Sequence, residues 1–409
     1  MPSTAPITVM PIFGTRPEAV KMAPLVNYLK ARPDDFQCIV CVTAQHRQML
    51  DQVLEFFQIT PDFDLDIMQT GQTLTQITTR ALSGLDDVLG EARPDIVLAQ
   101  GDTTTVLAAA LAAAYHKIAF GHVEAGLRTD NRFDPFPEEI NRRLTSQLTD
   151  LHFAPTAQAR ANLLREGVAP EAIYLTGNTV IDALHYVTGG GRPGDKVTRR
   201  HGDTVTGIQR DEVEGNDPAS GRTLLVTTHR RENWGEPLED IAHALHDIIE
   251  QFPDTRLVLP MHKNPVVREP LQRILGEHPR VALIEPPDYL DFVHLMQGAH
   301  LILTDSGGVQ EEAPALGLPV LVLRRTTERP EGVATGTAQL IGTKREDIVR
   351  AASLLLSDQA AYDSMSHAVN PYGDGHACER IADALRYWAG RGARPADFSP
   401  GTVPSGTSS

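Results

Sequence analysis

Carboxylates follow three short apolar segments in the first half of this 409-residue chain. Asp102 lies in QGDTTT, Glu124 lies in GHVEAGLRT, and Glu138 lies in PEEINRR. A glutamate between an apolar segment and a glycine is poorly suited to packing in a strand. Asp102 could also be only a helix N-cap, and Glu138 could simply complement a helix dipole. Three carboxylates at successive positions on the rim of the sheet could hold different pKa values and act as general acid and base.

Basic side chains follow other expected strands. Arg16 and Lys21 lie at the start of an expected helix beside a glycine turn, which suits phosphate or carboxylate binding, although helix capping explains them equally well. His229 leaves a strand with two arginines behind it, where it could contact a phosphate or carry a proton, and His262 ends another strand. No His or Cys pair has the spacing of a preorganised metal site, so no metal is expected.

The segment TDSGGVQEE combines a strand end, a glycine turn and a helix start. At Ser306, Gly307 and Gly308 this arrangement leaves backbone N–H groups where a pyrophosphate can bind, with the helix dipole behind them. Glu311 or Glu312 could accept hydrogen bonds from ribose hydroxyls, and Arg329 would supply countercharge. The segment predicts a nucleotide site, with a generic glycine-rich turn as the alternative.

The elements that must position these residues alternate along the chain. Short apolar segments alternate with longer stretches of helical periodicity, which predicts a mostly parallel sheet covered by helices. Strands are expected at Ile7–Phe13, Cys38–Thr43, Ile96–Gln100, Ile118–Val123, Thr223–Thr228, Leu257–Pro260, Leu301–Thr304 and Pro319–Leu323. Two such blocks predict an α/β chain with two Rossmann-like, doubly wound domains that face a central cleft.

A break in composition separates the two blocks. Residues 188–221 are rich in Gly, Asp and Arg and are typical of a linker or a surface excursion. We therefore expect an N-terminal domain over residues 1–187, which carries the carboxylates, and a C-terminal domain over residues 222–370. A helix within residues 371–392 could pack back on the first domain. Residues 393–409 are rich in Pro, Gly, Ser and Thr and are expected to be a disordered tail.

Composition and charge exclude several classes of protein. The chain has 53 acidic and 37 basic residues and a formal net charge of −16, which argues against coating nucleic acid or an anionic membrane. Its longest apolar run, Val106–Tyr115, is about half of the ~20 residues that span a bilayer. The first ten residues lack a basic leader and a long apolar stretch, so a cytoplasmic location is expected.

The order of the motifs resembles a known family, the bacterial non-hydrolysing UDP-N-acetylglucosamine 2-epimerases. The matching segments are GTRPEAVKMAPL, TAQHRQML, QGDTTT, GHVEAGLRT, PFPEEINR, TGNTVIDAL, TTHRREN, PMHKNP, DSGGVQEEAPALGLPVLVLR and TTERPE. The resemblance runs from about Ile7 to Trp388. It implies a glycosyltransferase-B-like fold, a homodimer, and interconversion of UDP-GlcNAc and UDP-ManNAc without an added cofactor. The product would supply ManNAc units for cell-surface polysaccharide.

The reaction that the resemblance implies is elimination of UDP to 2-acetamidoglucal, followed by re-addition with the opposite configuration. By matching motif, Asp102, Glu124 and Glu138 are the acid/base candidates, and His229 faces the departing UDP or assists proton transfer. By the same match, the UDP-binding positions are Arg16, Ser306, Gly307, Gly308, Glu312 and Arg329. The residues expected to line the site are Lys21, His262 and Phe292.

The resemblance also suggests a second, allosteric site, at Gln45, His46 and Gln48. In members that require UDP-GlcNAc as an activator, an arginine precedes the QTL segment, whereas Gly71 stands there in this chain. This departure argues against obligatory activation.

Three alternative functions stay open at this point. A hydrolysing epimerase that releases free ManNAc and UDP, or an epimerase specific for a modified UDP-sugar, would share these motifs. A glycosyltransferase of the same architecture would need an acceptor site and would not retain three carboxylates for chemistry at carbon 2. A non-enzymatic nucleotide-sugar sensor would bind UDP yet tolerate loss of Asp102.

Overall fold

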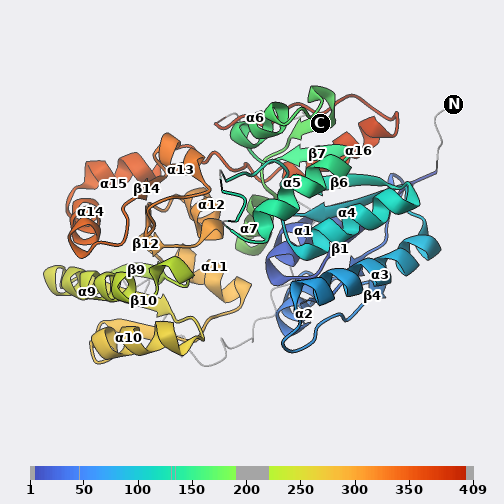
Figure 1. Cartoon of the computed structure of the whole chain (residues 1–409). Helices are drawn as coiled ribbons and strands as arrows, with labels where there is room; N and C mark the ends of the chain where they lie inside the picture. The colour runs from blue at the N-terminus through green and yellow to red at the C-terminus, as the bar shows by residue number, and fades with distance from the viewer. Residues whose placement is uncertain (1–4, 46, 130, 134, 190–220, 402–409) are drawn as a thin grey trace. The chain divides into compact units, whose positions relative to one another are not determined.

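The computed structural model describes residues 5–45, 47–129, 131–133, 135–189 and 221–401 of the chain. The chain divides into two compact units (Figure 1). The N-terminal unit comprises Met1–Tyr186 and Tyr372–Ser409, and the C-terminal unit comprises Val187–Pro371. Each unit is built on a parallel sheet with helices packed against it, which confirms the predicted α/β class with two Rossmann-like units. The cleft expected between them remains a prediction.

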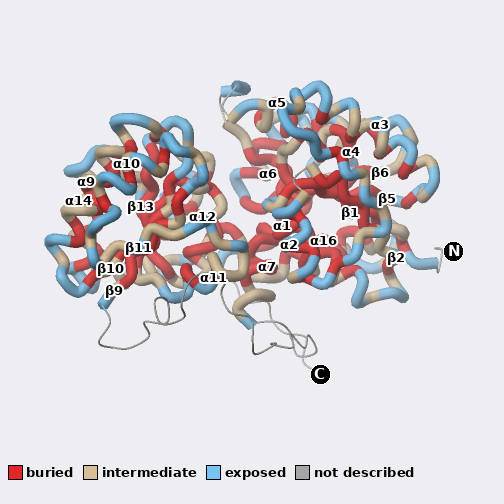
Figure 2. Tube along the Cα trace, turned by 90° about the horizontal axis from the view of Figure 1, so that it is seen from below, coloured by how far each residue is buried: buried red, intermediate tan, exposed pale blue. Residues whose placement is uncertain are grey.

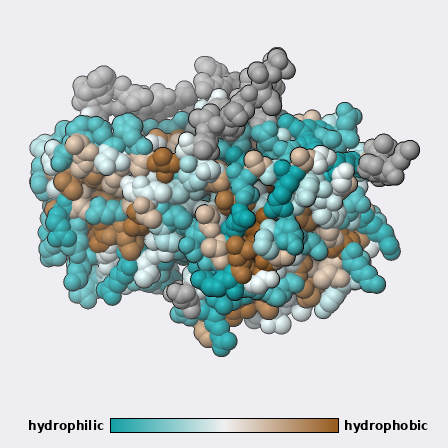
Figure 3. Space-filling view, turned by 90° about the horizontal axis from the view of Figure 1, so that it is seen from above, coloured by the Kyte–Doolittle hydropathy of each residue, from teal (hydrophilic) through white to brown (hydrophobic). Residues whose placement is uncertain are grey.

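Apolar residues are concentrated inside each unit. Buried stretches run through the middle of each unit, and exposed stretches lie at the periphery (Figure 2). Hydrophilic residues predominate on the face drawn in Figure 3, where hydrophobic residues occur in small groups among them. Among the described residues, no helix has both the length and the apolar character that a bilayer crossing requires.

The sheet of the N-terminal unit has the strand order β4-β3-β1-β5-β6-β7-β8, with β2 paired to β1. Its order reverses between β1 and β5, so the carboxyl ends of these strands form the switch point where such sheets bind ligands. The strands are β1 (Ile7–Phe13), β2 (Phe36–Cys38), β3 (Cys41–Val42), β4 (Phe63–Asp64), β5 (Ile96–Gln100), β6 (Ala119–Val123), β7 (Leu151–Ala154) and β8 (Ile173–Leu175).

Helices of the N-terminal unit bury their apolar stripes on this sheet. Side chains of α3, α4, β1, β5 and β6 form one hydrophobic cluster. Thr73 begins α3 with a capping box, and Lys117 ends α4 in the left-handed conformation. The helices are α1 (Arg16–Lys30), α2 (Arg47–Phe56), α3 (Leu74–Ala92), α4 (Thr104–His116), α5 (Glu138–Leu148), α6 (Ala157–Arg165), α7 (Thr179–Thr188) and α16 (Ala377–Trp388).

The predicted strand Cys38–Thr43 is wrong in one respect, because the structure breaks it into β2 and β3. At the break, the Val40 N–H donates to the carboxylate of Asp62 at 2.7 Å. The Val40 carbonyl accepts from the Asp62 N–H at 2.8 Å. Asp62 directly precedes β4, so Val40 bonds to the start of that strand at the point where β2 and β3 are separated.

The sheet of the C-terminal unit has the strand order β11-β10-β9-β12-β13-β14. Its order reverses between β9 and β12, which pair in parallel from Leu224–Leu301 to Thr227–Thr304. The strands are β9 (Arg222–Thr227), β10 (Thr255–Pro260), β11 (Val281–Ile284), β12 (Leu301–Thr304), β13 (Val320–Val322) and β14 (Ala338–Leu340).

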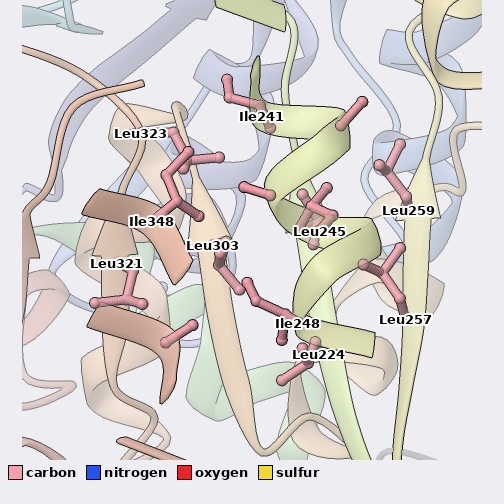
Figure 4. Close-up of a cluster of buried hydrophobic side chains, with 14 of the residues drawn as sticks. Leu224, Ile241, Leu245, Ile248, Leu257, Leu259, Leu303, Leu321, Leu323 and Ile348 are labelled. Atoms are coloured by element: carbon pink, nitrogen blue, oxygen red, sulfur yellow. The ribbon is translucent and has the colours of Figure 1, made fainter. Parts of the chain in front are cut away.

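One hydrophobic cluster joins this second sheet to α9, α10 and α14. Figure 4 shows Ile241, Leu245 and Ile248 of α9 facing leucines of β9, β10 and β12, with Ile348 of α14 beside them. The helices are α9 (Glu236–Gln251), α10 (Pro265–Leu275), α11 (Tyr289–Gln297), α12 (Gly307–Ala315), α13 (Pro330–Thr335), α14 (Arg345–Ser357) and α15 (Gln359–Ser366).

The chain returns to the N-terminal unit after residue 371. There, Arg386 of α16 forms an ion pair with Asp35 at 2.7 Å. Residues 190–220 of the expected linker lie outside the described residues. The predicted disorder is wrong for residues 393–401, because Phe398 is only 3% exposed and packs in a hydrophobic cluster of this unit. The rest of the expected tail, residues 402–409, lies outside the described residues.

Candidate active site

Asp102 follows β5 at the switch point of the N-terminal sheet. Gly101 makes the turn with a φ of +85°, and its N–H donates to the Val123 carbonyl at the end of β6 over 3.0 Å. Arg142 of α5 holds the Asp102 carboxylate from Nε at 2.9 Å and from Nη2 at 2.7 Å. Asn141 donates to the Asp102 carbonyl at 2.8 Å. Two adjacent residues of α5 therefore fix both the side chain and the backbone of Asp102.

Glu124 follows the neighbouring strand, β6, and is 8% exposed. Its φ is +64°, a left-handed conformation that costs free energy for a residue other than glycine and is common at functional sites. Lys21 of α1 forms an ion pair with Oε2 of Glu124. Asn178 donates to the same oxygen from Nδ2 at 2.8 Å. The carboxylate is thus aimed by its backbone and held by donors from two other segments.

Glu138 and Glu139 begin α5 but have different surroundings. Glu139 is fully buried, and Arg142 and Arg143 bind its carboxylate at 2.9 and 2.8 Å. Glu138 is partly buried and lies four residues before Arg142, which places both on one face of the helix. Glu139 therefore serves the structure through its ion pairs, whereas Glu138 is the less buried of the two acids.

Glu18, in the first turn of α1, links the loops after β1 and β5. Its carboxylate accepts from the N–H groups of Gly14 and Thr15 at 3.0 and 2.7 Å and from the Thr103 hydroxyl at 2.5 Å. Burial raises the pKa of Glu18, although these hydrogen bonds oppose the rise. Arg16, at the first position of α1, is half-buried beside this network. Sequence reasoning missed Glu18, although it lies inside the GTRPEAVK segment.

Two buried histidines lie side by side on β6 and β7, and sequence reasoning missed both. His122 is fully buried, and its Nε2 lies 2.7 Å from the Gly101 carbonyl, which can only accept, so Nε2 carries the proton. Burial lowers the pKa of His122 to about 4 and that of its strand neighbour His152 to about 3. His122 thus supports, as a neutral imidazole, the turn that carries Asp102. A histidine within the apolar segment AFGHV was the available signal.

Of the residues predicted for a second, allosteric site, Gln45 lies between β3 and α2, and Gln48 lies in the first turn of α2. Gln45 accepts a long hydrogen bond from the Thr105 hydroxyl at 3.4 Å. Gln48 is exposed, and His46 lies outside the described residues. The allosteric site therefore remains a prediction.

In the C-terminal unit, His229 follows β9 and lies against Asp305, which follows the neighbouring strand β12. Asp305 is fully buried, and its carboxylate accepts from the N–H groups of His229 and Arg230, both at 2.9 Å, and from Asn233 at 3.0 Å. The Nδ1 atom of His229 lies 3.1 Å from the same carboxylate. Burial raises the pKa of Asp305, but these hydrogen bonds outweigh it and the pKa stays below its ordinary value. Asp305 therefore orients the half-exposed His229 ring.

The glycine turn after Asp305 opens α12, with Ser306 as its N-cap. Glu328 lies so close to this turn that a methyl group on Gly307 would come within 2.7 Å of its Oε1. Arg230 and Arg324 pair with Glu328 at 3.3 and 2.5 Å. Burial opposes ionisation of Glu328, but neighbouring arginines lower its pKa to about 2. The helix N-terminus thus has a fixed carboxylate and two fixed guanidinium groups beside it.

The remaining C-terminal candidates make contacts that the sequence did not reveal. Arg329 is 7% exposed and forms an ion pair with the buried Glu311. Glu312 accepts from the hydroxyl of Tyr289 at 3.0 Å, and burial raises the pKa of that phenol well above its ordinary value. Phe292 lies on the same helix, α11, and is half-buried. Glu311 lies 18 residues from Arg329, and Tyr289 lies 23 residues from Glu312. No local sequence pattern therefore indicates either contact.

His262 follows β10 and is exposed. Its ring centroid lies 6.4 Å from that of His229, with an interplanar angle of 23°. Burial and the neighbouring His229 lower the pKa of His262. In the part of the chain that the structure describes, no group of three His, Cys, Asp or Glu side chains is arranged to hold a metal ion.

The predicted residues therefore gather at two places. In the N-terminal unit, Arg16, Lys21, Asp102 and Glu124 lie at the carboxyl ends of β1, β5 and β6 or on the helix that follows β1. In the C-terminal unit, His229 and the turn at residues 306–308 lie at the ends of the paired strands β9 and β12. Both places are the topological switch points of their sheets.

Sequence comparisons place this architecture among characterised proteins. A family model described as UDP-N-acetylglucosamine 2-epimerase matches residues 28–386. The chain is 55% identical over 381 residues to the UDP-N-acetylglucosamine 2-epimerase of Escherichia coli (strain K12), covering 92% of this chain and 98% of that protein. It is 52% identical over 394 residues to the Bacillus subtilis (strain 168) protein of the same name, covering 96% and 99%.

Structural comparisons agree. The chain is similar to the MnaA–UDP co-structure from S. aureus, with a TM-score of 0.84, 46% identity and coverage of 96% of this chain and 100% of that one. A UDP-GlcNAc 2-epimerase from Neisseria meningitidis bound to UDP-GlcNAc has a TM-score of 0.83, 46% identity and coverage of 93% and 100%. At 14% identity, the glycotransferase of kitacinnamycin has a TM-score of 0.63, which shows a shared fold alone.

Proposed function

The chain belongs to the UDP-N-acetylglucosamine 2-epimerase family, and from this premise we propose that it is a non-hydrolysing epimerase that interconverts UDP-GlcNAc and UDP-ManNAc. One observation carries the proposal. Asp102 and Glu124 are carboxylates at adjoining strand ends, and each is held by a cation from another element. Solved relatives bound to UDP and to UDP-GlcNAc support the choice of substrate.

The proposed reaction begins with elimination. A carboxylate takes the proton from carbon 2, the electrons of that C–H bond form the C1=C2 double bond, and the C1–O bond breaks with its electron pair on UDP. Re-addition reverses these steps, with the proton delivered to the other face of carbon 2. The two faces need two proton carriers, and Asp102 and Glu124, with Glu138 as the third candidate, supply carboxylates from separate segments.

Asp102 and Glu124 each lie against a basic side chain, and this arrangement suits the proposed reaction. Lys21 beside Glu124 and Arg142 beside Asp102 place a positive charge against each carboxylate. The same cations would attenuate repulsion between these carboxylates and an anionic substrate. Both acids are also fixed in position before substrate arrives, which lowers the reorganisation that catalysis would otherwise demand.

UDP is proposed to bind at the turn that opens α12. Gly307 and Gly308 offer N–H groups at a helix N-terminus, a standard arrangement for phosphate. The N–H of Ser306 donates to the Thr304 hydroxyl at 2.9 Å, so Ser306 would contribute its side-chain hydroxyl. Arg329 adds charge, and Glu312 would accept from ribose hydroxyls. His229, oriented by Asp305, would face the departing diphosphate, while Arg16, His262 and Phe292 complete the proposed substrate contacts.

The proposal extends to the biological setting. The protein would act as a homodimer in the cytoplasm, without an added cofactor, and would supply ManNAc units for cell-surface polysaccharide. The close similarity to bacterial epimerases over more than nine-tenths of the chain supports this setting.

The test is to incubate pure protein with UDP-GlcNAc in deuterated water and to follow the products by NMR. A mixture of UDP-GlcNAc and UDP-ManNAc with deuterium at carbon 2 is expected. Free ManNAc and UDP would instead indicate the hydrolysing alternative. No new sugar and no deuterium would refute an epimerase and leave a glycosyltransferase or a sensor.

Asp102→Asn and Glu124→Gln are expected to abolish turnover and to leave UDP affinity largely intact, because these carboxylates would repel the diphosphate and do not hold it. Isothermal titration with UDP measures the second effect. Glu91→Gln, on the exposed face of α3, is the matched control and should turn over like the wild type. A near wild-type rate in either active-site variant would show that the acid was wrongly assigned.

A further inference from the structure

A segment after α16 lies along the edge of the N-terminal sheet. The Phe398 N–H donates to the Leu175 carbonyl at 2.7 Å. Arg394 donates to the Ile173 carbonyl at 2.5 Å. Because β8 ends the strand order of this sheet, residues 394–398, here called the C-terminal strap, cover an edge that would otherwise present unpaired carbonyls.

Side chains anchor the strap on both sides. Asp397 pairs with Arg160 of α6 at 2.6 Å, and the red C-terminal segment runs beside α6 in Figure 1. The guanidinium group of Arg380 lies 5.4 Å from the centroid of the Phe398 ring. The ring itself is buried in a cluster that comprises Ala125, Leu127, Ala154, Ala159, Leu163, Ile173, Leu175 and Phe398.

The surroundings of the Phe398 ring include two positions next to the proposed active site. Ala125, a member of the same cluster, directly follows Glu124. Gly177 directly precedes Asn178, and a methyl group on Gly177 would lie 3.7 Å from Cγ of Phe398. Glu124 and Asn178 are the two partners of a 2.8 Å hydrogen bond. The ring therefore supports the chain on either side of that bond.

We propose that Phe398 is a positioning residue for the proposed epimerase reaction, on which this inference rests. Its ring holds the segments of Glu124 and Asn178 in register, so that Lys21 and Asn178 keep one carboxylate oxygen in place. The left-handed backbone of Glu124 is conformationally unfavourable and persists only because its surroundings hold it. Removing the ring would take away one of the contacts that hold this backbone, and the carboxylate itself would be unchanged.

The test compares Phe398→Ala and Phe398→Leu with the wild type. In Phe398→Ala, kcat for epimerisation should fall by roughly 10- to 100-fold, the scale expected when a catalytic group is misplaced by about 1 Å. KM for UDP-GlcNAc and the affinity for UDP should stay unchanged. Phe398→Leu should recover most of kcat, because an apolar side chain of similar reach still fills the cluster.

Phe36→Ala is the matched control. Phe36 is 2% exposed on β2 and lies against Arg386, at 5.1 Å from ring centroid to guanidinium carbon, away from the Glu124 loop. The Phe36→Ala variant loses an equivalent ring from the same unit. Its melting temperature should therefore fall, and its kcat should stay unchanged. Rates are compared per folded molecule, below both melting temperatures. An equal fall of kcat in both alanine variants, or an unchanged kcat in Phe398→Ala, would overturn the proposal.

Amide hydrogen exchange separates this inference from the proposed function. Peptides that cover residues 124–127 and 176–178 should exchange faster in Phe398→Ala than in Phe36→Ala. If the wild type proves to have no epimerase activity, the proposed function fails by itself. Unchanged exchange in these peptides would show that Phe398 does not support the loops, whatever the activity of the wild type.

Discussion

Lowering the pH from 7 to 5 should destabilise the N-terminal unit through two buried histidines. His122 is 0% exposed and His152 is 2% exposed, and burial lowers their pKa values to about 4 and about 3. An unfolded chain binds these protons near pH 6.5. Between pH 6.5 and pH 4 the unfolded state therefore holds protons that the folded state does not, and stability falls as the pH falls through that window.

The magnitude follows from the width of this window. Each pH unit below 6.5 costs about 1.4 kcal/mol for a histidine that stays neutral in the folded state. At pH 5 the cost is about 2 kcal/mol for each ring. The two costs add to about 4 kcal/mol, because both rings are uncharged in the folded state at that pH and do not repel each other. The Nδ1 atoms of both rings are buried with no hydrogen-bond partner among the described residues, so an added proton would find no acceptor.

Urea unfolding at pH 7 and pH 5 measures this effect. The chain has two tryptophans, Trp388 in the N-terminal unit and Trp234 in the C-terminal unit, so a Trp234→Phe background reports on the N-terminal unit alone. The double variant His122→Gln/His152→Gln should lose about 4 kcal/mol less than its parent between the two pH values, and each single variant about half as much. The raised pKa of Glu18 increases stability as the pH falls, which opposes the effect of the histidines. Glu18 is present in the parent and in each variant, so its contribution cancels in the comparison.

Two results would refute the reasoning. If the double variant is as sensitive to acid as its parent, other groups carry the loss of stability. If the parent is equally stable at pH 7 and pH 5 and the double variant gains no stability at pH 5, the folded protein protonates these imidazoles despite their burial.

The C-terminal unit provides two further predictions. Asp305→Asn should lower the free energy of unfolding by about 3 kcal/mol, because an amide cannot accept from all the donors of a buried carboxylate. Asp254→Asn, which breaks an exposed pair with Arg222, should cost less than about 1 kcal/mol in the same urea experiment. Gly307→Ala should weaken UDP binding by about tenfold, or ~1.4 kcal/mol, because its methyl group must displace the fixed Glu328. Titration calorimetry measures this change, and an unchanged affinity would place UDP away from the turn.

The long buried strands could be predicted from the sequence because their apolar segments are continuous. Ile7–Phe13 and Ile96–Gln100 have the predicted bounds, since parallel strands covered on both faces are apolar throughout. The short strands β4 and β8 were not predicted, because two or three residues carry no periodicity. Their place is set by neighbouring strands and not by their own sequence.

The candidate acids could also be predicted, whereas the contacts that hold them could not. Glu124 stands out because a charged residue follows a buried strand. Its partner Asn178 lies 54 residues further along the chain, in the TGNTVIDAL segment, and nothing in either segment shows that the two side chains meet. Composition similarly predicted a disordered tail, because a single Phe398 and its two charged neighbours are too few to change an average over 17 residues. Such contacts depend on the folded sheet edge, which the local sequence does not encode.

The acidic composition of the chain does not oppose the binding of a diphosphate. Near the start of α12, Glu328 binds Arg230 and Arg324, and Glu311 binds Arg329. Each carboxylate lowers the positive charge of the region but also fixes the position of a guanidinium group, which otherwise loses conformational entropy when a phosphate binds. Arginines held in advance bind an anion with a smaller entropic cost than mobile ones. Part of the net charge of −16 thus belongs to residues that prepare an anion site.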